Sequence, residues 1–303
     1  ERDAERRQNT WWVDTQDDVY EMVYVLVYRG EDIKFSPSLT GDLTAGFYIV
    51  NRVQAETDSN VLIVDGYIKE EIANTYAEAE VLTIQGDTRA ITLASESVED
   101  PLGKNANIWG YVLRAGYQDH KWTALMEHGY ASGDDKPTDA DFNGRPLHPD
   151  HNVGLLFYEE IMSRVTAEAW GDGAKGLWSN GGVYNSRYIF PNVRYRPLPN
   201  WELSAAYMMA WPDKPDGSKI LCKEGDAVDC TVYSATADYL AYEVDVAVKH
   251  RWAEHVNFSV EGGFAHVTDR IPLKSTGMQY ETDDDGHTYG DFWTVKSRIA
   301  YEF

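Results

Sequence analysis

Residues 240–252 read LAYEVDVAVKHRW, and their two-residue alternation decides the fold of this chain. A period of two places successive side chains on opposite faces of a β-strand. The even positions are apolar or aromatic except for one histidine. The odd positions hold all of the charge, at Glu243, Asp245, Lys249 and Arg251. The stretch therefore predicts a strand with one apolar face and one charged face.

The same period recurs along the chain and predicts an all-β protein. It is found in eleven segments: 20–29, 43–53, 61–69, 76–85, 108–118, 122–130, 189–197, 201–211, 240–252, 256–267 and 293–303. Weaker alternation covers 32–39 and 89–95. The one stretch with helical character is 153–170. Helices and strands are not predicted to alternate along the chain, which argues against a βαβ protein.

Aromatic residues mark both ends of the apolar faces, for example at Trp201 and Trp211. Eight strand residues rise about 26 Å, close to the height of the apolar band between the aromatic girdles of outer-membrane barrels. The final residue, Phe303, ends an alternating strand and resembles the C-terminal signal that the barrel-assembly machinery reads. We therefore predict a transmembrane antiparallel up-and-down β-barrel of about 12–16 strands in a Gram-negative outer membrane, in contact with lipid and lipopolysaccharide.

Composition sets limits on function. The 303 residues include 50 acids and 27 bases, for a net charge of −23, which excludes a nucleic-acid binder with a general basic surface. The 43% hydrophobic content argues against a disordered acidic polymer. No boundary or linker stands out, so we predict a single domain over 1–303. Its long acidic loops are predicted at 132–152, 212–229 and 270–290.

Charge on the presumed inner faces of the strands is balanced, with ten bases and ten acids. The excess acid therefore lies in loops, turns and termini, where it raises the local concentration of cations at the mouths. We predict that eight charged residues line a pore: Arg114, Arg194, Arg196, Glu243, Asp245, Lys249, Lys296 and Arg298. The alternative is that the inner charges pair across strands and fill the lumen.

Two smaller motifs lie in the expected loops. The run Asp139, Asp141, Asn143 fits the start of a calcium-binding loop, with Gly144 at the turn and Asp150 at the twelfth position. It predicts a Ca²⁺ ion in an outer loop, with a solvated acidic loop as the alternative.

Cys222 and Cys230 lie eight residues apart in a polar stretch. They predict a disulfide suited to an oxidising compartment, with two unrelated thiols as the alternative.

Several segments resemble the alginate-export-type outer-membrane porins. The closest is Glu127–Asp139, EHGYASGDDKPTD, followed by Pro146–Gly154, PLHPDHNVG. Residues 64–69 and the hairpin from Tyr242 to Phe264 are also similar. The resemblance implies an outer-membrane barrel that passes solutes or a polysaccharide. An alginate exporter needs net positive charge in its pore, and the balanced inner faces do not show an excess.

The combined prediction is a porin-like channel for passive passage of small solutes or a saccharide. No hydrolase, metalloprotease or phosphate-loop motif is present, so we predict no enzymatic activity and no required cofactor. Two alternatives stay open: a barrel that sheathes a partner such as an electron-transfer cytochrome, and a soluble all-β carbohydrate-binding protein. Channel conductance separates the first of these from a porin.

Overall fold

The computed structural model describes most of the chain as one antiparallel β-sheet. The ranges it describes are 19–36, 38–55, 59–88, 104–134, 141–145, 147, 151, 153–164, 182–214, 237–253, 255–271, 273 and 278–301. The weak candidate at 89–95, both cysteines and Phe303 lie outside these ranges.

Eleven long strands build the sheet, and each of the eleven predicted segments falls on one of them. They are β1 (Val19–Ser36), β2 (Leu39–Gln54), β3 (Ser59–Ile72), β4 (Thr75–Thr88), β5 (Lys104–Gln118), β6 (Trp122–Ala131), β8 (Ser186–Leu198), β9 (Trp201–Pro212), β10 (Ala241–Ala253), β11 (Val256–Val267) and β13 (Thr288–Tyr301). Two strands of two residues each, β7 (Asp141–Phe142) and β12 (Glu281–Thr282), bring the total to thirteen. The weak candidate at 32–39 is the end of β1 and the start of β2.

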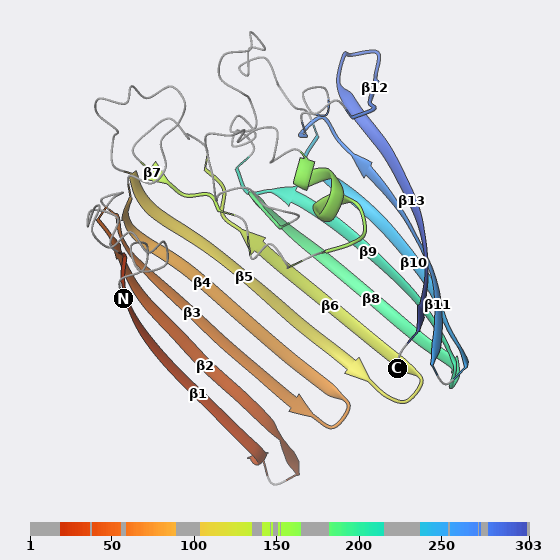
Figure 1. The fold of residues 1–303 in the computed structure, drawn as a ribbon, viewed down its shortest axis with the longest axis horizontal. Helices are drawn as coiled ribbons and strands as arrows, with labels where there is room; N and C mark the ends of the chain where they lie inside the picture. Colours follow the sequence, from red (N-terminus) through yellow and green to blue (C-terminus); the bar gives the residue numbers. More distant parts are fainter. Residues whose placement is uncertain are drawn as a thin grey trace.

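Each long strand pairs antiparallel with the next along the chain, and the sheet curves as it runs from β1 to β13 (Figure 1). Tight connections such as Ala73–Asn74 lie at one end of the strands, which we call the turn end. The longer connections lie at the other end, the loop end. Within the described residues, β1 and β13 form the two edges and do not pair with each other. Because the number of long strands is odd, these two edges run in the same direction.

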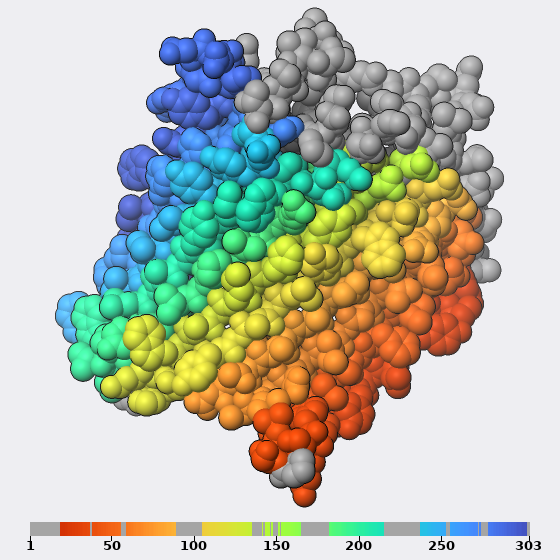
Figure 2. Space-filling model, turned by 180° about the vertical axis from the view of Figure 1, so that it is seen from behind, coloured from red at the N-terminus to blue at the C-terminus, as the bar shows by residue number. Residues whose placement is uncertain are grey.

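Figure 2 shows the convex face of the sheet as a continuous surface across the strands. Large apolar side chains are exposed on it from β1 to β13. Large side chains that point outward stay exposed, for example Trp109 at 44%, Leu203 at 38% and Val246 at 55%. In water, an apolar patch of this extent marks an interaction surface or an aggregation site. Strands of 10 to 18 residues match or exceed the roughly 9–11 that cross a bilayer when tilted. The fold is therefore the predicted transmembrane barrel-type sheet, and the apolar face is the one that suits lipid.

Among the described residues, the packed core of the concave face lies at the loop end. Residues 153–164 fold inward from the connection between β6 and β8, with a π-helix, η1, over Phe157–Ile161 (Figure 1). We call this segment the insertion. Phe157 and Tyr158 are fully buried there against Tyr188 and Met208. Among the described residues, no helix is long and apolar enough to cross a membrane.

Candidate functional site

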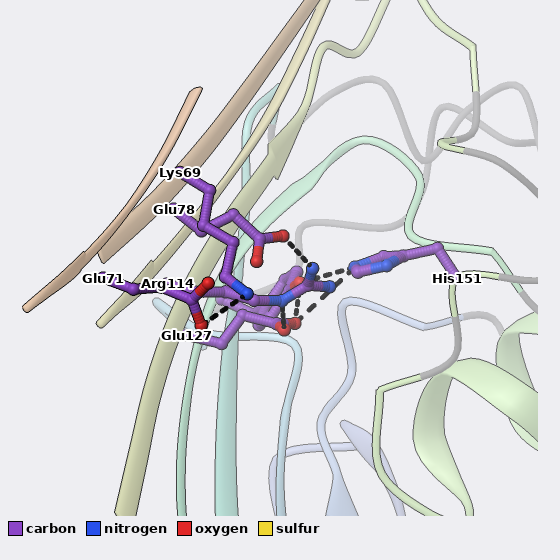
Figure 3. Close-up of polar contacts among 7 residues, drawn as sticks. Lys69, Glu71, Glu78, Arg114, Glu127 and His151 are labelled. Atoms are coloured by element: carbon purple, nitrogen blue, oxygen red, sulfur yellow. Dashed lines mark hydrogen bonds and ion pairs between the residues drawn. The ribbon is translucent and has the colours of Figure 1, made fainter. Parts of the chain in front are cut away.

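The inner face begins as a row of paired charges across β4, β5 and β6. The strand register places Glu78, Arg114 and Glu127 side by side. Arg114 donates from Nη1 to Glu78 Oε1 over 2.8 Å and from Nε to Glu127 Oε2 over 2.6 Å (Figure 3). One guanidinium therefore bridges two carboxylates and neutralises one of their two charges, which matches the charge pairing that the sequence left open as an alternative.

Glu127 connects this network to Tyr188 on β8 and to His151, which lies two residues before the insertion. Tyr188 donates its hydroxyl proton to Glu127 Oε1 over 2.6 Å, and His151 Nε2 lies 2.8 Å from the same hydroxyl oxygen. Because that proton is given to Glu127, the bond between His151 and Tyr188 requires the imidazole proton on Nε2. His151 Nε2 also lies 3.6 Å from Glu127 Oε1. Figure 3 shows His151 pointing toward the Arg114 network from a connecting segment that is not part of a strand.

Glu243 on β10 holds the start of η1. Its Oε1 accepts the backbone N–H groups of Leu155 and Leu156 over 2.5 and 2.8 Å, and its Oε2 accepts that of Phe157 over 2.7 Å. The first N–H groups of a helical segment have no partner within the segment, so a carboxylate there satisfies them and complements the dipole. Glu243 is 0% exposed and Asp245 9% exposed, so the insertion covers both.

Two glycines allow the insertion to lie this close to the wall. Gly154 has a φ of +76°, and a Cβ at this position would come within 2.8 Å of Glu243 Oε1. Gly129 on β6 leaves room for the Tyr188 ring, which a Cβ would approach to 2.3 Å. Both positions therefore exclude a larger side chain for reasons of space, and Gly154 also for its backbone conformation.

The buried phenols of the insertion and of the adjacent segment before β8 are neutral. Burial raises the pKa of Tyr158, whose hydroxyl shares a 2.8 Å hydrogen bond with Ser186. Burial also raises the pKa of Tyr184, and the negative charge of Asp134 adds to the shift. Neither group ionises at neutral pH.

The turn end of the same wall is open. A cavity of about 550 Å³ lies there on the inner face of β8 to β13. Its lining holds five bases and two carboxylates: Arg196, Lys249, Arg251, Lys296, Arg298, Glu202 and Glu261. We call it the basic cavity. It is the part of the concave face where the balance of charge predicted for the wall breaks down.

Two of the five bases are already engaged. Arg196 donates to Glu202 from Nε and Nη2, both over 3.0 Å, and Lys296 Nζ lies 3.6 Å from Glu160 on η1. The side chains of Lys249, Arg251 and Arg298 form no ion pair with a described residue.

The register sets Lys249, Ser259 and Arg298 opposite one another on three adjacent strands. Strands lie about 4.8 Å apart, so the two bases flank a short serine at a separation near 10 Å.

The eight residues predicted to line a pore all lie on the concave face, but in four settings. Arg114 is bound within the charge network, and Glu243 and Asp245 are covered by the insertion. The basic cavity holds four more, Arg196, Lys249, Lys296 and Arg298. Arg194 lies nearby, exposed, opposite Ser204 and Thr123. Their part in a conducting pore stays a prediction.

The calcium motif is described only in its middle. Asp141 lies in β7, paired with β5, and its Oδ1 accepts a 3.4 Å bond from Asn105. Asn143 N donates to Asp134 Oδ2 over 3.3 Å. Asp139 and Asp150 lie outside the described ranges, and within those ranges no three His, Cys, Asp or Glu side chains form a metal cluster. Calcium binding stays a prediction, as does the disulfide between Cys222 and Cys230.

Sequence reasoning missed the insertion's docking surface. The helical character noted for 153–170 is realised over Phe157–Ile161 and the short turn after it. The missed signal is a local loss of alternation: near the loop end, inner positions such as Tyr188, Met208 and Ala265 are apolar like the outer ones. A strand that is apolar on both faces is buried on both faces, which indicates a second layer inside the sheet.

Comparisons with known proteins give no family. No protein-family model matches the chain, and no curated protein matches it. Among solved structures, the outer-membrane phospholipase A from Escherichia coli aligns over 99% of this chain and 86% of its own, with a TM-score of 0.27 and 7% identity. A likeness at this level carries no argument, so the fold assignment rests on the strand pairing and the two faces described above. The resemblance to alginate-export porins stays a prediction.

Proposed function

We propose that this protein is an outer-membrane channel for the passive passage of small solutes. The observation that supports it is the contrast between the apolar convex face and the concave face, which keeps a cavity of about 550 Å³ lined by charged side chains at the turn end. Charged groups exposed to water inside a lipid-embedded sheet are typical of an aqueous pore.

The insertion narrows this channel without covering all of it. It packs against β6 and β8 to β11. On the inner face of β1, the valines at positions 23, 25 and 27 stay 46%, 62% and 59% exposed. A narrowed lumen favours small solutes over a polymer. In this proposal the outer face contacts lipid and lipopolysaccharide, the C-terminal strand docks on the assembly machinery, and no catalytic step takes place.

The test is conductance in a planar bilayer. Purified full-length protein added to a bilayer in KCl is expected to give discrete current steps of uniform size. A protein that inserts, as judged by protection from added protease, and gives no steps overturns the proposal.

A second candidate is a sheath around a partner protein, such as an electron-transfer cytochrome. It is favoured by the exposed valines on the inner face of β1, because an apolar inner surface suits a protein partner better than water. A silent barrel that co-purifies from the outer membrane with a stoichiometric haem protein supports the sheath. Current steps from the protein alone support the channel.

A further inference from the structure

We infer that the basic cavity binds a compact oxyanion with two or more negative charges, such as a phosphate or dicarboxylate group. This rests on the proposed channel function for its role in passage, although binding itself does not require conduction. The chain as a whole is strongly acidic, so a local surplus of bases inside it is not a consequence of composition.

Positive charge in the basic cavity stays uncompensated among the described residues. Of the five bases in the cavity, Arg196 is held by Glu202, and Lys296 lies near Glu160. Lys249, Arg251 and Arg298 have no ion-pair partner among the described residues. The one carboxylate of the cavity without a described ion pair is Glu261. Three unengaged bases against one carboxylate leave a positive site that a dianion neutralises better than chloride does.

The placement of two of these bases on the two strands that flank β11 suits an anion. Lys249 and Arg298 face the same side of β10 and β13, with Ser259 of β11 between them in register. A serine is short, so an anion can lie over it and accept a hydrogen bond from its hydroxyl while the two bases approach from either side. Arg298 offers a planar fork of N–H donors, which matches the paired oxygens of a carboxylate or phosphate.

The size of the basic cavity limits the size of the ligand. The cavity of about 550 Å³ accommodates a small molecule, and the loop end of the same strands is filled by the insertion. A long polysaccharide would have to pass Phe157 and Tyr158, which are fully buried against the wall. The site therefore selects a compact anion over a polymer.

The test uses inorganic phosphate at pH 8, where it is mainly the dianion, and the full-length protein in a planar bilayer. Wild-type channels are expected to pass chloride in preference to potassium, and added phosphate is expected to block the chloride current with a saturable dose dependence. Arg298→Gln and Lys249→Gln are each expected to weaken the block about fivefold, the effect of one unit charge at a hydrated contact distance. Arg52→Gln is the matched control, because it removes an inner-face base at the loop end of β2, the opposite end of the strands from the basic cavity, and is expected to leave the block unchanged.

Failure of the inference and failure of the channel are distinguishable. Current steps that prefer potassium and ignore phosphate overturn the inference and leave the channel in place. If the protein gives no current, equilibrium dialysis of radiolabelled phosphate against the detergent-solubilised protein decides the inference alone. Saturable binding that Arg298→Gln weakens and Arg52→Gln preserves supports it, whereas no saturable binding overturns it. Succinate in place of phosphate then separates a carboxylate site from a phosphate site, and long alginate chains that block as well as phosphate contradict the selection for compact anions.

Discussion

Strand β10 carries charge at both of its ends, and the two ends do opposite things. At the loop end, Glu243 is completely buried and binds three backbone N–H groups of the insertion. At the turn end, Lys249 and Arg251 are exposed in the basic cavity and have no described ion-pair partner. The residues share one face and one period. An inward-facing charged side chain therefore holds another segment in place where that segment packs over it, and stays available to bind a ligand where none does.

The largest expected effect comes from breaking the anchor. Glu243→Gln removes the charge that three N–H donors share and places an amide N–H₂ against one of them. We expect a loss of about 3 kcal/mol in the free energy of unfolding, the cost of losing charge-assisted bonds and leaving a buried donor without an acceptor. Urea unfolding in detergent measures the loss, and limited proteolysis detects release of the insertion.

The matched control is Glu261→Gln, also on the inner face but without an ion pair among the described residues. It is expected to change the unfolding midpoint little. An insertion that stays as protease-resistant in Glu243→Gln as in the wild type would contradict the anchoring role.

A second test compares Tyr188, which lies under the insertion, with Tyr158, which belongs to it. Tyr188→Phe removes the bond to the Glu127 carboxylate and the contact with His151, so we expect a cost of about 2 kcal/mol. Tyr158→Phe removes only a neutral bond to Ser186, with an expected cost of about 1 kcal/mol. Urea unfolding of both variants checks the order, and equal costs would show that the charge on Glu127 adds nothing.

At the open end, substitution is expected to leave stability almost unchanged. Arg298→Gln breaks no described ion pair, so the free energy of unfolding is expected to move by less than about 0.5 kcal/mol. The same urea measurement checks this value. A loss comparable to that of Glu243→Gln would show that the base is structural, and the contrast between the two ends would disappear.

The smallest effect concerns the turn end outside the strands. In the β5–β6 turn, the Asp119 carboxylate accepts the backbone N–H groups of Trp122 and Lys121, and these bonds lower its pKa. A lowered pKa means that this stabilisation is present above the unfolded-state value near 3.9 and is lost as pH falls through the folded-state pKa. Asp119→Asn is therefore expected to flatten the pH dependence of the unfolding midpoint below about pH 4. An identical acid profile in both proteins would contradict this assignment.

Much of the sheet could be predicted from the sequence because strand alternation is a local property. A residue such as Val246 points away from Asp245 in any strand, so the apolar and charged faces follow from neighbours in the chain. Wherever one face is apolar, register is also constrained, since a slip by one residue turns every side chain to the other face. The pairing of Arg114 with Glu78 and Glu127 depends on register across three strands, which the sequence left as one of two alternatives.

The site could be predicted only as a set of inward charges. The sequence determined the eleven strands, their two faces and the positions at which charge points inward, because a period of two acts between adjacent residues. Only the tertiary structure decided that Glu243 is covered and Lys249 is open, because the covering residues 153–164 lie about ninety positions away in the chain. Burial depends on that distant segment, so the same alternation yields a covered stretch of β10 at one end and an exposed one at the other.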